Sequence, residues 1–560
     1  MKNKRIVVIG GSAAGPKAAS RARRLDEDAE VCLIQKSADL SMASCGYPYY
    51  VGGFFDDRNQ LLCSPAGVVR DSRFFWNAKK IETHVNTEVV SIDRVNKTIN
   101  FNNLLTGETG TMLYDKLVLA TGATPRRPPV PGIDLQGVTT LQSMGDADYL
   151  RKVHDEGLIK KAVVVGGGLI GIETTEALHL AGIEITMVEM LPQLLTFLDY
   201  QMAKLVEKYV QTKANVILNN GVAEFLGENG KLRAVKLQDG TEVECELAVL
   251  AIGVIPNTKL ARDAGLETGI TGGVVVNEYL QTNDPDIYAV GDCIEVPHLV
   301  TGKPVHAPFG DLANLQGRVV GENVILGNVA SFPGTIQTGV CKVFEYGVGS
   351  TGLSEKNAEK AGMTNIATVV NASLDKPGFM QGKLLITKLI VERSTHRIVG
   401  AQVIGPGEVS KQLAIWALAI QGKMTVEQMI NADLPYAPPY SLAIDHSIAT
   451  AHVMQNKLRS FFKGISADEL NEQLINNQKP FLLDVRNPVE YEQLRLDIGE
   501  VLLPLGQLRS RLSELPADKN QEIVVWCKIS LRGYEAALIL QANGYRNVKV
   551  LEGGIVAWPY

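Results

Sequence analysis

Residues 162–171 read Ala-Val-Val-Val-Gly-Gly-Gly-Leu-Ile-Gly, and a helical pattern continues through Glu173–Leu180. The apolar run predicts a buried strand, so the order is strand, glycine turn, helix. Gly166, Gly168 and Gly171 complete a Gly-x-Gly-x-x-Gly pattern, which lets the backbone approach a pyrophosphate at a helix N-terminus. The stretch therefore predicts a parallel α/β domain that binds a dinucleotide.

An acidic residue stands where this domain would meet a ribose. The next predicted strand, Glu184–Val188, is followed by Glu189. A carboxylate here would accept hydrogen bonds from the ribose hydroxyls of NAD and would repel the extra phosphate of NADP. We therefore expect NADH, rather than NADPH, at this turn.

A second, less complete version of the pattern lies at the N-terminus. The predicted strand Arg5–Ile9 leads into Gly10-Gly11-Ser12-Ala13-Ala14-Gly15, and a helix is expected from Pro16 to about Leu25. The following strand, Glu30–Gln35, ends in a neutral side chain that can still hydrogen-bond to a ribose. The residues expected to contact a dinucleotide here are Gly10, Ser12, Ala13, Gly15 and Gln35.

A single cysteine follows this N-terminal unit in the stretch Ser41-Met-Ala-Ser-Cys-Gly-Tyr-Pro-Tyr-Tyr50. The next cysteine is Cys63, so a Cys-x4-Cys redox disulfide cannot form here. Cys45 is either a buried structural thiol or a redox group whose partner is a cofactor, a small thiol or oxygen. Ser41 and Ser44 are the candidate substrate contacts beside it.

Three later segments extend the dinucleotide-binding pattern. Leu117–Pro125 is a predicted buried strand that ends in the turn Thr121-Gly122, and the proline-rich segment 126–132 is expected to be a crossover. Leu247–Val254 repeats the strand pattern around Gly253. Thr282–Asp292 ends in Tyr-Ala-Val-Gly-Asp, with Gly291 and Asp292 as further candidate cofactor contacts.

Taken in this order, residues 1–325 resemble the FAD-dependent pyridine nucleotide–disulfide oxidoreductases. The resemblance implies an FAD domain interrupted by an NADH domain, with Asp292 on the ribityl chain. The pattern from Ser41 to Tyr49 is similar to the single-cysteine branch, which includes CoA-disulfide reductases, NADH-dependent persulfide reductases and NADH oxidases or peroxidases. In that family the cysteine faces the flavin on the side opposite the nicotinamide, which makes Cys45 the expected catalytic thiol.

Two positions of the sequence differ from the pattern of this branch and narrow the expected chemistry of Cys45. The asparagine that often precedes the cysteine in CoA-linked members is Ser44 here. The histidine that oxidase and peroxidase members carry in the first glycine loop is absent from Ser12-Ala13-Ala14, which argues against peroxide chemistry. An NADH oxidase that uses a Cys45 sulfenate remains an alternative.

Residues 331–450 resemble the dimerisation domain of the same family. Strands are expected at Thr338–Glu345, Leu384–Val391 and Gly400–Ile404, and a helix at Ser410–Gln421. The loop 433–440 contains Tyr-Ala-Pro-Pro-Tyr. In CoA-disulfide reductases a similar loop reaches the partner subunit's cysteine, so Tyr436 and Tyr440 are candidate catalytic residues. The alternative is that both tyrosines only pack.

The C-terminal segment resembles a rhodanese domain. It begins with the helix-cap pattern Ser466-Ala-Asp-Glu, and strands are expected at Phe481–Arg486 and Glu522–Trp526. Cys527-Lys-Ile-Ser-Leu-Arg532 would form a loop whose N–H groups face the thiolate and stabilise a persulfide. Cys527 and Arg532 are the expected functional residues. Ser530 replaces the usual mid-loop glycine, and the usual Gly-His is missing near Leu494–Asp497, so a non-catalytic rhodanese is the alternative.

Lys17, Arg21 and Arg24 share one face of the first predicted helix, because they are spaced i, i+4, i+7. They form either an ordinary solvated surface or a patch that binds the phosphates of coenzyme A.

Composition limits the remaining possibilities. The 560 residues are 45% hydrophobic and 21% charged with a net charge of −6, which fits three to five globular domains and gives no basic excess for nucleic acid. The seven cysteines have no paired spacing, which favours a reducing compartment and argues against a disulfide scaffold or a metal site. Cys32, Cys63, Cys245, Cys293 and Cys341 are expected to be packing thiols. No signal peptide or membrane span is expected, and the predicted location is the cytoplasm.

The whole chain thus predicts an α/β protein with two Rossmann-like domains, an α+β dimerisation domain and an α/β rhodanese domain. The expected ranges are 1–147 and 246–328 for the FAD domain, 148–245 for the NADH domain, 329–450 for dimerisation, 451–464 for a linker and 465–560 for the rhodanese. The overall resemblance is to NADH-dependent persulfide reductases with a C-terminal rhodanese domain, also called CoA-disulfide reductase isoforms. It implies a homodimer that reduces sulfane sulfur through Cys45 while Cys527 handles persulfide sulfur. A rhodanese sulfur carrier that serves a partner protein is the alternative from another functional class.

Overall fold

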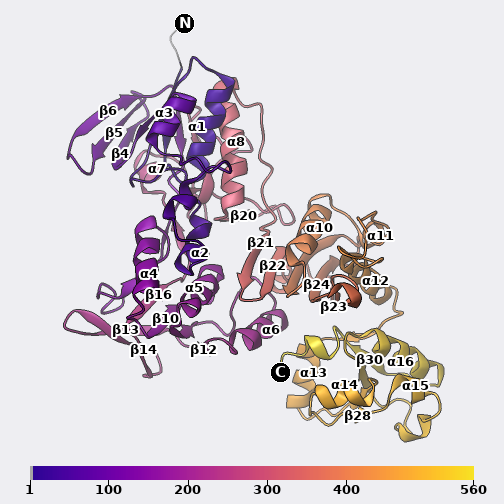
Figure 1. Cartoon of the computed structure of the whole chain (residues 1–560). Coiled ribbons are helices and arrows are strands. Elements are labelled where there is room, and N and C mark those ends of the chain that lie inside the picture. Colours follow the sequence, from indigo (N-terminus) through magenta and orange to yellow (C-terminus); the bar gives the residue numbers. More distant parts are fainter. Residues whose placement is uncertain (1–3) are drawn as a thin grey trace. The chain divides into compact units, whose positions relative to one another are not determined.

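A computed structural model describes residues 4–560 (Figure 1). Contacts divide the chain into two compact units. The first comprises residues up to Pro192 together with Ala214–Thr335, and the second comprises Gln193–Lys213 together with Ile336–Tyr560. The class is α/β, with two parallel Rossmann-like sheets in the first unit and an antiparallel and a parallel sheet in the second.

The first unit opens with a parallel sheet of order β18-β7-β1-β2-β3. Its strands are β1 (Arg5–Ile9), β2 (Glu30–Ile34), β3 (Ile81–His84), β7 (Lys116–Leu119) and β18 (Ile287–Ala289). Its helices are α1 (Ala14–Leu25), α3 (Ser72–Lys79) and α8 (Gly310–Leu326). The short helix α2 (Tyr47–Val51) packs against the later helices α4 and α5, and α7 (Lys259–Asp263) packs against the strand β4. An antiparallel meander adds β4 (Thr87–Asp93), β5 (Thr98–Asn103) and β6 (Thr109–Leu113).

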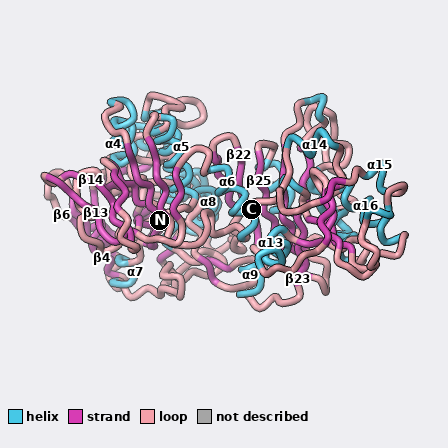
Figure 2. Tube along the Cα trace, turned by 90° about the horizontal axis from the view of Figure 1, so that it is seen from below, coloured by secondary structure: helices cyan, strands magenta, loops and turns pink. Residues whose placement is uncertain are grey.

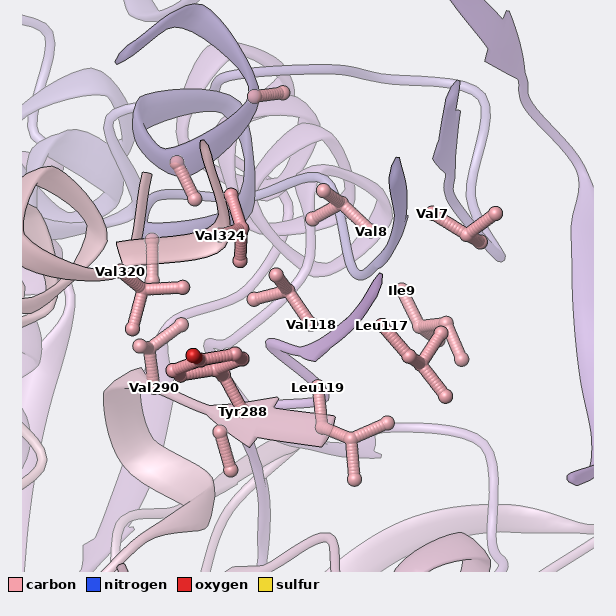
Figure 3. Packing of buried hydrophobic residues seen from close by; sticks show 14 of the residues in the cluster. Val7, Val8, Ile9, Leu117, Val118, Leu119, Tyr288, Val290, Val320 and Val324 are labelled. Atoms are coloured by element: carbon pink, nitrogen blue, oxygen red, sulfur yellow. The ribbon is translucent and has the colours of Figure 1, made fainter. Parts of the chain in front are cut away.

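The core of this sheet is made from its central strands and the helices that cover them. Figure 3 shows Val118 of β7 and Tyr288 of β18 packed with Val320 and Val324 of α8. Both strands are apolar at nearly every position because a parallel sheet covered by helices is buried on both faces. This core fixes the carboxyl ends of β1 and β7, where the first glycine turn and the Thr121-Gly122 turn lie.

A second parallel sheet of the first unit has the order β12-β11-β10-β16-β9. Its strands are β9 (Val138–Thr139), β10 (Lys161–Val165), β11 (Glu184–Val188), β12 (Asn215–Ile217) and β16 (Leu247–Leu250), with helices α4 (Met144–Glu156) and α5 (Leu169–Leu180). A hairpin meander contributes β13 (Val222–Glu228), β14 (Lys231–Leu237) and β15 (Glu242–Glu244). The short strands β8 (Ala123–Pro125) and β17 (Val254–Pro256) pair antiparallel to one another.

The second sheet extends beyond the range expected for the NADH domain. β16 pairs with β10 and β9 pairs with β16, although both strands lie outside residues 148–245. Backbone hydrogen bonding to β10 therefore places Leu247–Leu250 in this sheet rather than in the second part of the FAD domain. The other expected domain limits remain predictions.

The second unit contains an antiparallel sheet of order β21-β22-β25-β24-β23. Its strands are β21 (Gly339–Val343), β22 (Tyr346–Gly352), β23 (Ile366–Leu374), β24 (Leu384–Glu392) and β25 (Ile398–Gly405). Its helices are α6 (Tyr200–Val210), α9 (Glu355–Lys360), α10 (Val409–Gln421), α11 (Val426–Met429) and α12 (His446–Leu458). Part of the expected linker, 451–464, lies within the last of these helices. Residues 451–458 belong to α12, which packs on β23 and whose Ala451 and Met454 are buried, and Gly464 already begins the next sheet.

A parallel sheet of order β26-β30-β29-β27-β28 completes the chain. Its strands are β26 (Gly464–Ile465), β27 (Phe481–Asp484), β28 (Val501–Leu502), β29 (Ile523–Trp526) and β30 (Val548–Leu551). Its helices are α13 (Ala467–Ile475), α14 (Pro488–Gln493), α15 (Leu505–Leu508) and α16 (Leu531–Ala542), and α15 lies beside α16 in Figure 2. The expected cap at Ser466 is a capping box with Glu469.

Candidate functional site

The backbone of the first glycine turn is packed so closely that Gly10 and Gly15 leave no room for a side chain. Gly10 has φ +111°, and a Cβ on it would lie 2.0 Å from the Ala120 carbonyl oxygen. A Cβ on Gly15 would lie 1.9 Å from the Gly10 carbonyl oxygen. Ser12 is exposed and Ala13 is half-buried, while α1 begins at Ala14, two residues earlier than expected. The turn is therefore bare backbone directly in front of a helix N-terminus.

Gln35 holds this turn in place. Its side-chain oxygen accepts the Gly11 N–H at 2.8 Å, and its side-chain nitrogen donates to the Ser37 hydroxyl at 2.7 Å. Thr121 and Gly122 lie across the sheet, where Asn257 braces them through the Thr121 hydroxyl and carbonyl groups. Gly253 adopts φ +90° and accepts from the Arg126 N–H. Sequence patterns did not identify Asn257, because it lies 136 residues from Thr121.

The second glycine turn, between β10 and α5, has the same close backbone packing. A Cβ on Gly171 would lie 2.0 Å from the Gly166 carbonyl oxygen, whereas a Cβ on Gly168 would meet no atom within 4 Å. Glu189 stands at the end of β11, where its carboxylate accepts from the Gly167 N–H at 2.7 Å and the Leu191 N–H at 2.9 Å. The acidic residue is thus fixed against the glycine turn, as its spacing predicted.

Cys45 lies in a short 3-10 turn, Ser44–Gly46, directly before α2. Its thiol is exposed, and its sulfur would be 3.4 Å from a Cβ on Gly310, the first residue of α8. Ser44 is exposed, and Ser41 is half-buried in a left-handed conformation with φ 53°. The loop therefore presents the sulfur at the N-terminus of a 17-residue helix, which has no side-chain cap.

The surroundings of Cys45 favour the thiol over the thiolate. Desolvation raises the pKa of Cys45, and the carboxylates of Glu173, Asp292 and Asp311 raise it further. Asp292 follows Gly291, whose N–H is bound by Gln316, and burial raises the pKa of this carboxyl group. The polypeptide alone does not activate the sulfur, so a group bound beside it has to offset the carboxylates.

Glu173 is a site residue that sequence patterns missed. It lies on α5, two residues beyond Gly171, and accepts from the Tyr49 hydroxyl at 3.3 Å. Burial raises the pKa of Glu173 to about 7. The available signal was its place one turn into the helix that follows the second glycine turn. This contact joins the second dinucleotide turn to the segment that carries Cys45.

Cys527 is buried directly after β29, in a loop that leads into α16. In the described chain, the N–H groups of Lys528 to Arg532 hydrogen-bond to no acceptor, so they are available to a negatively charged sulfur. The Arg532 guanidinium interacts electrostatically with Cys527. The loop is backed by residues 554–556, because the Ile555 N–H donates to the Cys527 carbonyl.

Sequence comparisons and structural comparisons give the same assignment. The family model described as pyridine nucleotide-disulphide oxidoreductase matches residues 4–307. The chain belongs to this family. The model of the family's dimerisation domain matches residues 338–448, and a rhodanese-like domain model matches residues 466–559.

Three relatives illustrate the range of this oxidoreductase family. A solved structure of an NAD-dependent persulfide reductase from A. fulgidus is 41% identical, covers 99% of this chain and 100% of its own, and superposes with a TM-score of 0.93. An NADH oxidase of Methanocaldococcus jannaschii is 34% identical over 78% of this chain and 96% of its own. An NAD(P)H coenzyme A polysulfide/persulfide reductase of Pyrococcus horikoshii is 32% identical over 81% of this chain and 98% of its own.

The two glycine turns of the oxidoreductase fit FAD and NADH, the cofactors of its family. Both α1 and α5 begin without a side-chain cap and without an acidic residue in the first turn, so their N–H groups can bind pyrophosphate. The first turn would hold FAD, and Gly291 and Asp292 lie at the same edge of that sheet. The second turn, together with Glu189, would hold NADH. Among the described residues, no helix is long and apolar enough to span a membrane.

The predicted coenzyme A contacts are not equivalent in the oxidoreductase. Arg21 forms an ion pair with Glu322 of α8 at 2.6 Å, and Gly321 allows the two helices to pack closely there. Lys17 is half-buried and Arg24 is exposed, and neither has an ion pair in the described chain. Lys17 and Arg24 therefore remain the better predicted phosphate contacts, since the charge of Arg21 is already neutralised.

The loop with Tyr436 and Tyr440 is fixed at its base and open at its tip. The side chains of the two tyrosines are 55% and 74% exposed. Asp445 anchors the loop, since it accepts from the Ser441 hydroxyl and from Lys411, which also reaches the Tyr440 carbonyl. Both tyrosines are therefore available to a partner, and their catalytic role remains a prediction.

Ser530 occupies the position where the rhodanese loop usually has glycine. It has φ 78°, and its hydroxyl donates to the Leu551 carbonyl at 2.8 Å. Ser530→Ala should destabilise the protein by about 1 kcal/mol, because the left-handed strain persists while the hydrogen bond is lost. Ser530→Gly should change the free energy of unfolding by less than about 0.5 kcal/mol, because relief of strain offsets the lost bond. Urea unfolding of both variants measures this, and equal losses would contradict it.

The Glu173 carboxyl group predicts a pH-dependent stability. Its pKa rises from an ordinary 4.5 to about 7, so folding favours its neutral form. The stability that it contributes is present below pH 4.5 and is lost as the pH rises through about 7. Glu173→Gln keeps a neutral acceptor for the Tyr49 hydroxyl. The free energy of unfolding of this variant relative to wild type should therefore rise by about 2–3 kcal/mol between pH 5 and pH 8, and its relative Tm should rise with it. A constant difference in Tm would contradict this pKa.

Proposed function

We propose that this oxidoreductase uses NADH to reduce sulfane sulfur through Cys45 and releases a thiol and sulfide. The observation that carries the proposal is the presence of two sulfur-handling cysteines with different surroundings on one chain. Cys45 is exposed at the N-terminus of α8 with no cysteine beside it, and Cys527 lies in a loop of free N–H groups. A lone thiol of the first kind can attack a sulfur–sulfur bond, and a loop of the second kind can hold a persulfide.

The net reaction is NADH + H⁺ + RSSH → NAD⁺ + RSH + H₂S. Bound FAD would supply the transfer of an electron pair from NADH to sulfur. The Cys45 thiolate would attack the inner sulfur of the persulfide, which breaks the sulfur–sulfur bond, expels hydrosulfide and leaves a Cys45–S–S–R disulfide. Two electrons then cleave this disulfide into RS⁻ and the Cys45 thiolate. The sulfur lies at the N-terminus of α8 in both steps, and the bound cofactor would have to offset the carboxylates of Glu173, Asp292 and Asp311.

Two relatives support this substrate class. The A. fulgidus structure is described as an NAD-dependent persulfide reductase and covers the whole architecture, including the rhodanese domain. The P. horikoshii relative is described as a coenzyme A polysulfide/persulfide reductase. The M. jannaschii relative, which matches 78% of this chain, is described as an NADH oxidase, so oxygen is an acceptor that must be tested.

The proposal is tested by NADH oxidation with CoA persulfide in the absence of oxygen, while sulfide is measured in parallel. We expect one sulfide for each NADH consumed. NADH consumption only in air, without sulfide, would replace this proposal with the oxidase. A requirement for an added protein acceptor, together with loss of activity when residues 465–560 are deleted, would instead favour a sulfur carrier.

Coenzyme A recognition gives a separate prediction. Lys17→Glu and Arg24→Glu should each raise the KM for CoA persulfide about 10-fold, because each replaces an attraction to phosphate with a repulsion. The KM for inorganic polysulfide should stay within about 2-fold. Lys36→Glu, which changes a cation on another element, is the matched control. Equal effects on both substrates would show that these residues do not bind the phosphates.

We also infer a cytoplasmic homodimer. The matched dimerisation domain fits the dimer, and the exposed tips of Tyr436 and Tyr440 would then meet the partner subunit. All seven cysteines are free in the structure, which suits a reducing compartment. Sedimentation analysis of the purified protein tests the dimer.

A further inference from the structure

The charge around Cys527 is set by a residue outside its loop. Arg532 is bound in a two-pronged ion pair by Glu490 of α14, with distances of 2.6 Å and 2.8 Å between its nitrogens and the carboxylate oxygens. Hydrogen bonds from Arg532 hold the pKa of Glu490 at about 2, so the carboxylate stays charged. The guanidinium that interacts electrostatically with Cys527 is therefore already neutralised by a fixed negative charge.

The other arginines nearby are occupied as well. Arg486 is buried, pairs with Asp484, and donates to the carbonyl groups of Glu490 and Leu494. Arg495 pairs with Asp497 at 2.6 Å. Lys528 is exposed and has no ion pair within the described residues, so one flexible cation is left for a substrate.

The surface next to this cluster is apolar. Leu531 follows Ser530 in the loop and is 62% exposed, Val489 precedes Glu490 on α14, and Leu494 follows α14. The Glu490–Arg532 pair holds these two segments together. A donor that reaches Cys527 thus meets apolar side chains, backbone N–H groups and little net positive charge.

We infer that Glu490 selects the sulfur donor of Cys527, so that an organic persulfide charges this cysteine and thiosulfate does not. This inference deepens the proposed function and rests on the sulfur-handling role given there to Cys527. Thiosulfate brings two negative charges to a cysteine thiolate and needs a free guanidinium to offset them. An alkyl persulfide brings at most one charge at sulfur, and its neutral carbon chain suits the apolar rim.

Both reactions are sulfur transfers that balance without an added oxidant. With a persulfide, the Cys527 thiolate bonds to the outer sulfur, the R–S to sulfur bond breaks, and RS⁻ leaves with the electron pair. With thiosulfate, the same attack breaks the bond between the two sulfurs and releases sulfite. The two donors therefore differ in the charge that the site must accept rather than in the chemistry at Cys527.

The test uses the full-length Cys45→Ser protein with its cofactor, so that Cys45 cannot take up or pass on the sulfur. The protein is incubated separately with the persulfide of 2-mercaptoethanol, whose carbon chain is neutral, and with thiosulfate at equal concentrations, and the added sulfur on the Cys527 peptide is measured by mass spectrometry. We expect the persulfide to charge Cys527 at least 10-fold faster than thiosulfate. Adding Glu490→Gln should raise the thiosulfate rate at least 10-fold and change the persulfide rate less than 3-fold.

Glu535→Gln is the matched control, because Glu535 is exposed on α16 near Arg532 and has no ion pair in the described chain. It should leave the ratio of the two rates unchanged. If thiosulfate adds sulfur to Cys527 as fast as the persulfide does in the protein that retains Glu490, the inference is wrong, whatever the variants do. A well-folded Glu490→Gln protein with an unchanged ratio, or with equal losses for both donors, overturns it too. The proposed function is judged separately, by NADH-dependent sulfide release from wild-type protein.

Discussion

Replacing Cys45 with serine is expected to lower NADH-dependent sulfide release from CoA persulfide by about 1,000-fold or more. The thiol is the group in the described part of the chain that is both exposed and placed at the α8 N-terminus. A serine hydroxyl has nearly the same shape but cannot form the disulfide that stores the reaction's intermediate. The measurement is the steady-state rate of sulfide formation without oxygen, with cofactor content confirmed by absorbance.

Two further variants make this result specific. Cys63→Ser changes a half-buried thiol that donates to the Gly67 carbonyl, and it should leave the rate within about 2-fold of wild type. Cys527→Ser removes the rhodanese thiol and separates direct reduction at Cys45 from a route that passes through both cysteines. A Cys45→Ser protein that releases sulfide at the normal rate would refute the proposed mechanism.

Replacing Glu189 with glutamine is expected to lower the preference for NADH over NADPH by about 10-fold or more. Glu189 is held at the end of β11 by the Gly167 and Leu191 N–H groups. Glutamine can still accept these bonds through its carbonyl oxygen, so the change removes the charge and keeps the turn. The loss of repulsion should act mainly on NADPH, whose kcat/KM should rise.

The measurement is the ratio of kcat/KM for the two nucleotides with the same sulfur acceptor. Glu184→Gln is the control, since Glu184 is exposed at the opposite end of the same strand. It removes the same charge from the same element and should leave the ratio unchanged. If both variants shift the ratio equally, Glu189 does not distinguish the ribose of NADH from the phosphorylated ribose of NADPH.

Several site residues could be predicted from the sequence because their roles depend on local spacing. Gly166, Gly171 and Glu189 follow from the order of strand, turn and helix, and the structure places all three at one sheet edge. The fold class followed from the same repeated pattern, and the comparisons confirm it. The start of the first helix was predicted two residues late, since α1 begins at Ala14 rather than at Pro16.

The residues that the sequence did not reveal act over long separations. Tyr49 meets Glu173 across 124 residues, and Glu490 meets Arg532 across 42. Nothing in either segment marks these residues as partners, because each is an ordinary polar side chain in an ordinary helix. Arg532 has no recognisable partner in the sequence, but in the structure Glu490 of α14 neutralises it in an ion pair.

By itself, the sequence determined the glycine turns and the order of the domains, and it predicted that Cys45 and Cys527 are the two sulfur-handling cysteines. These features depend on backbone conformations and spacings that a few neighbouring residues fix, as the positive φ angles of Gly10 and Gly166 illustrate. Only the tertiary structure decided the electrostatic surroundings of the two thiols. A charge acts through space rather than along the chain, so the surroundings of Cys45 and Cys527 depend on which distant carboxylates and helix ends the fold brings beside them.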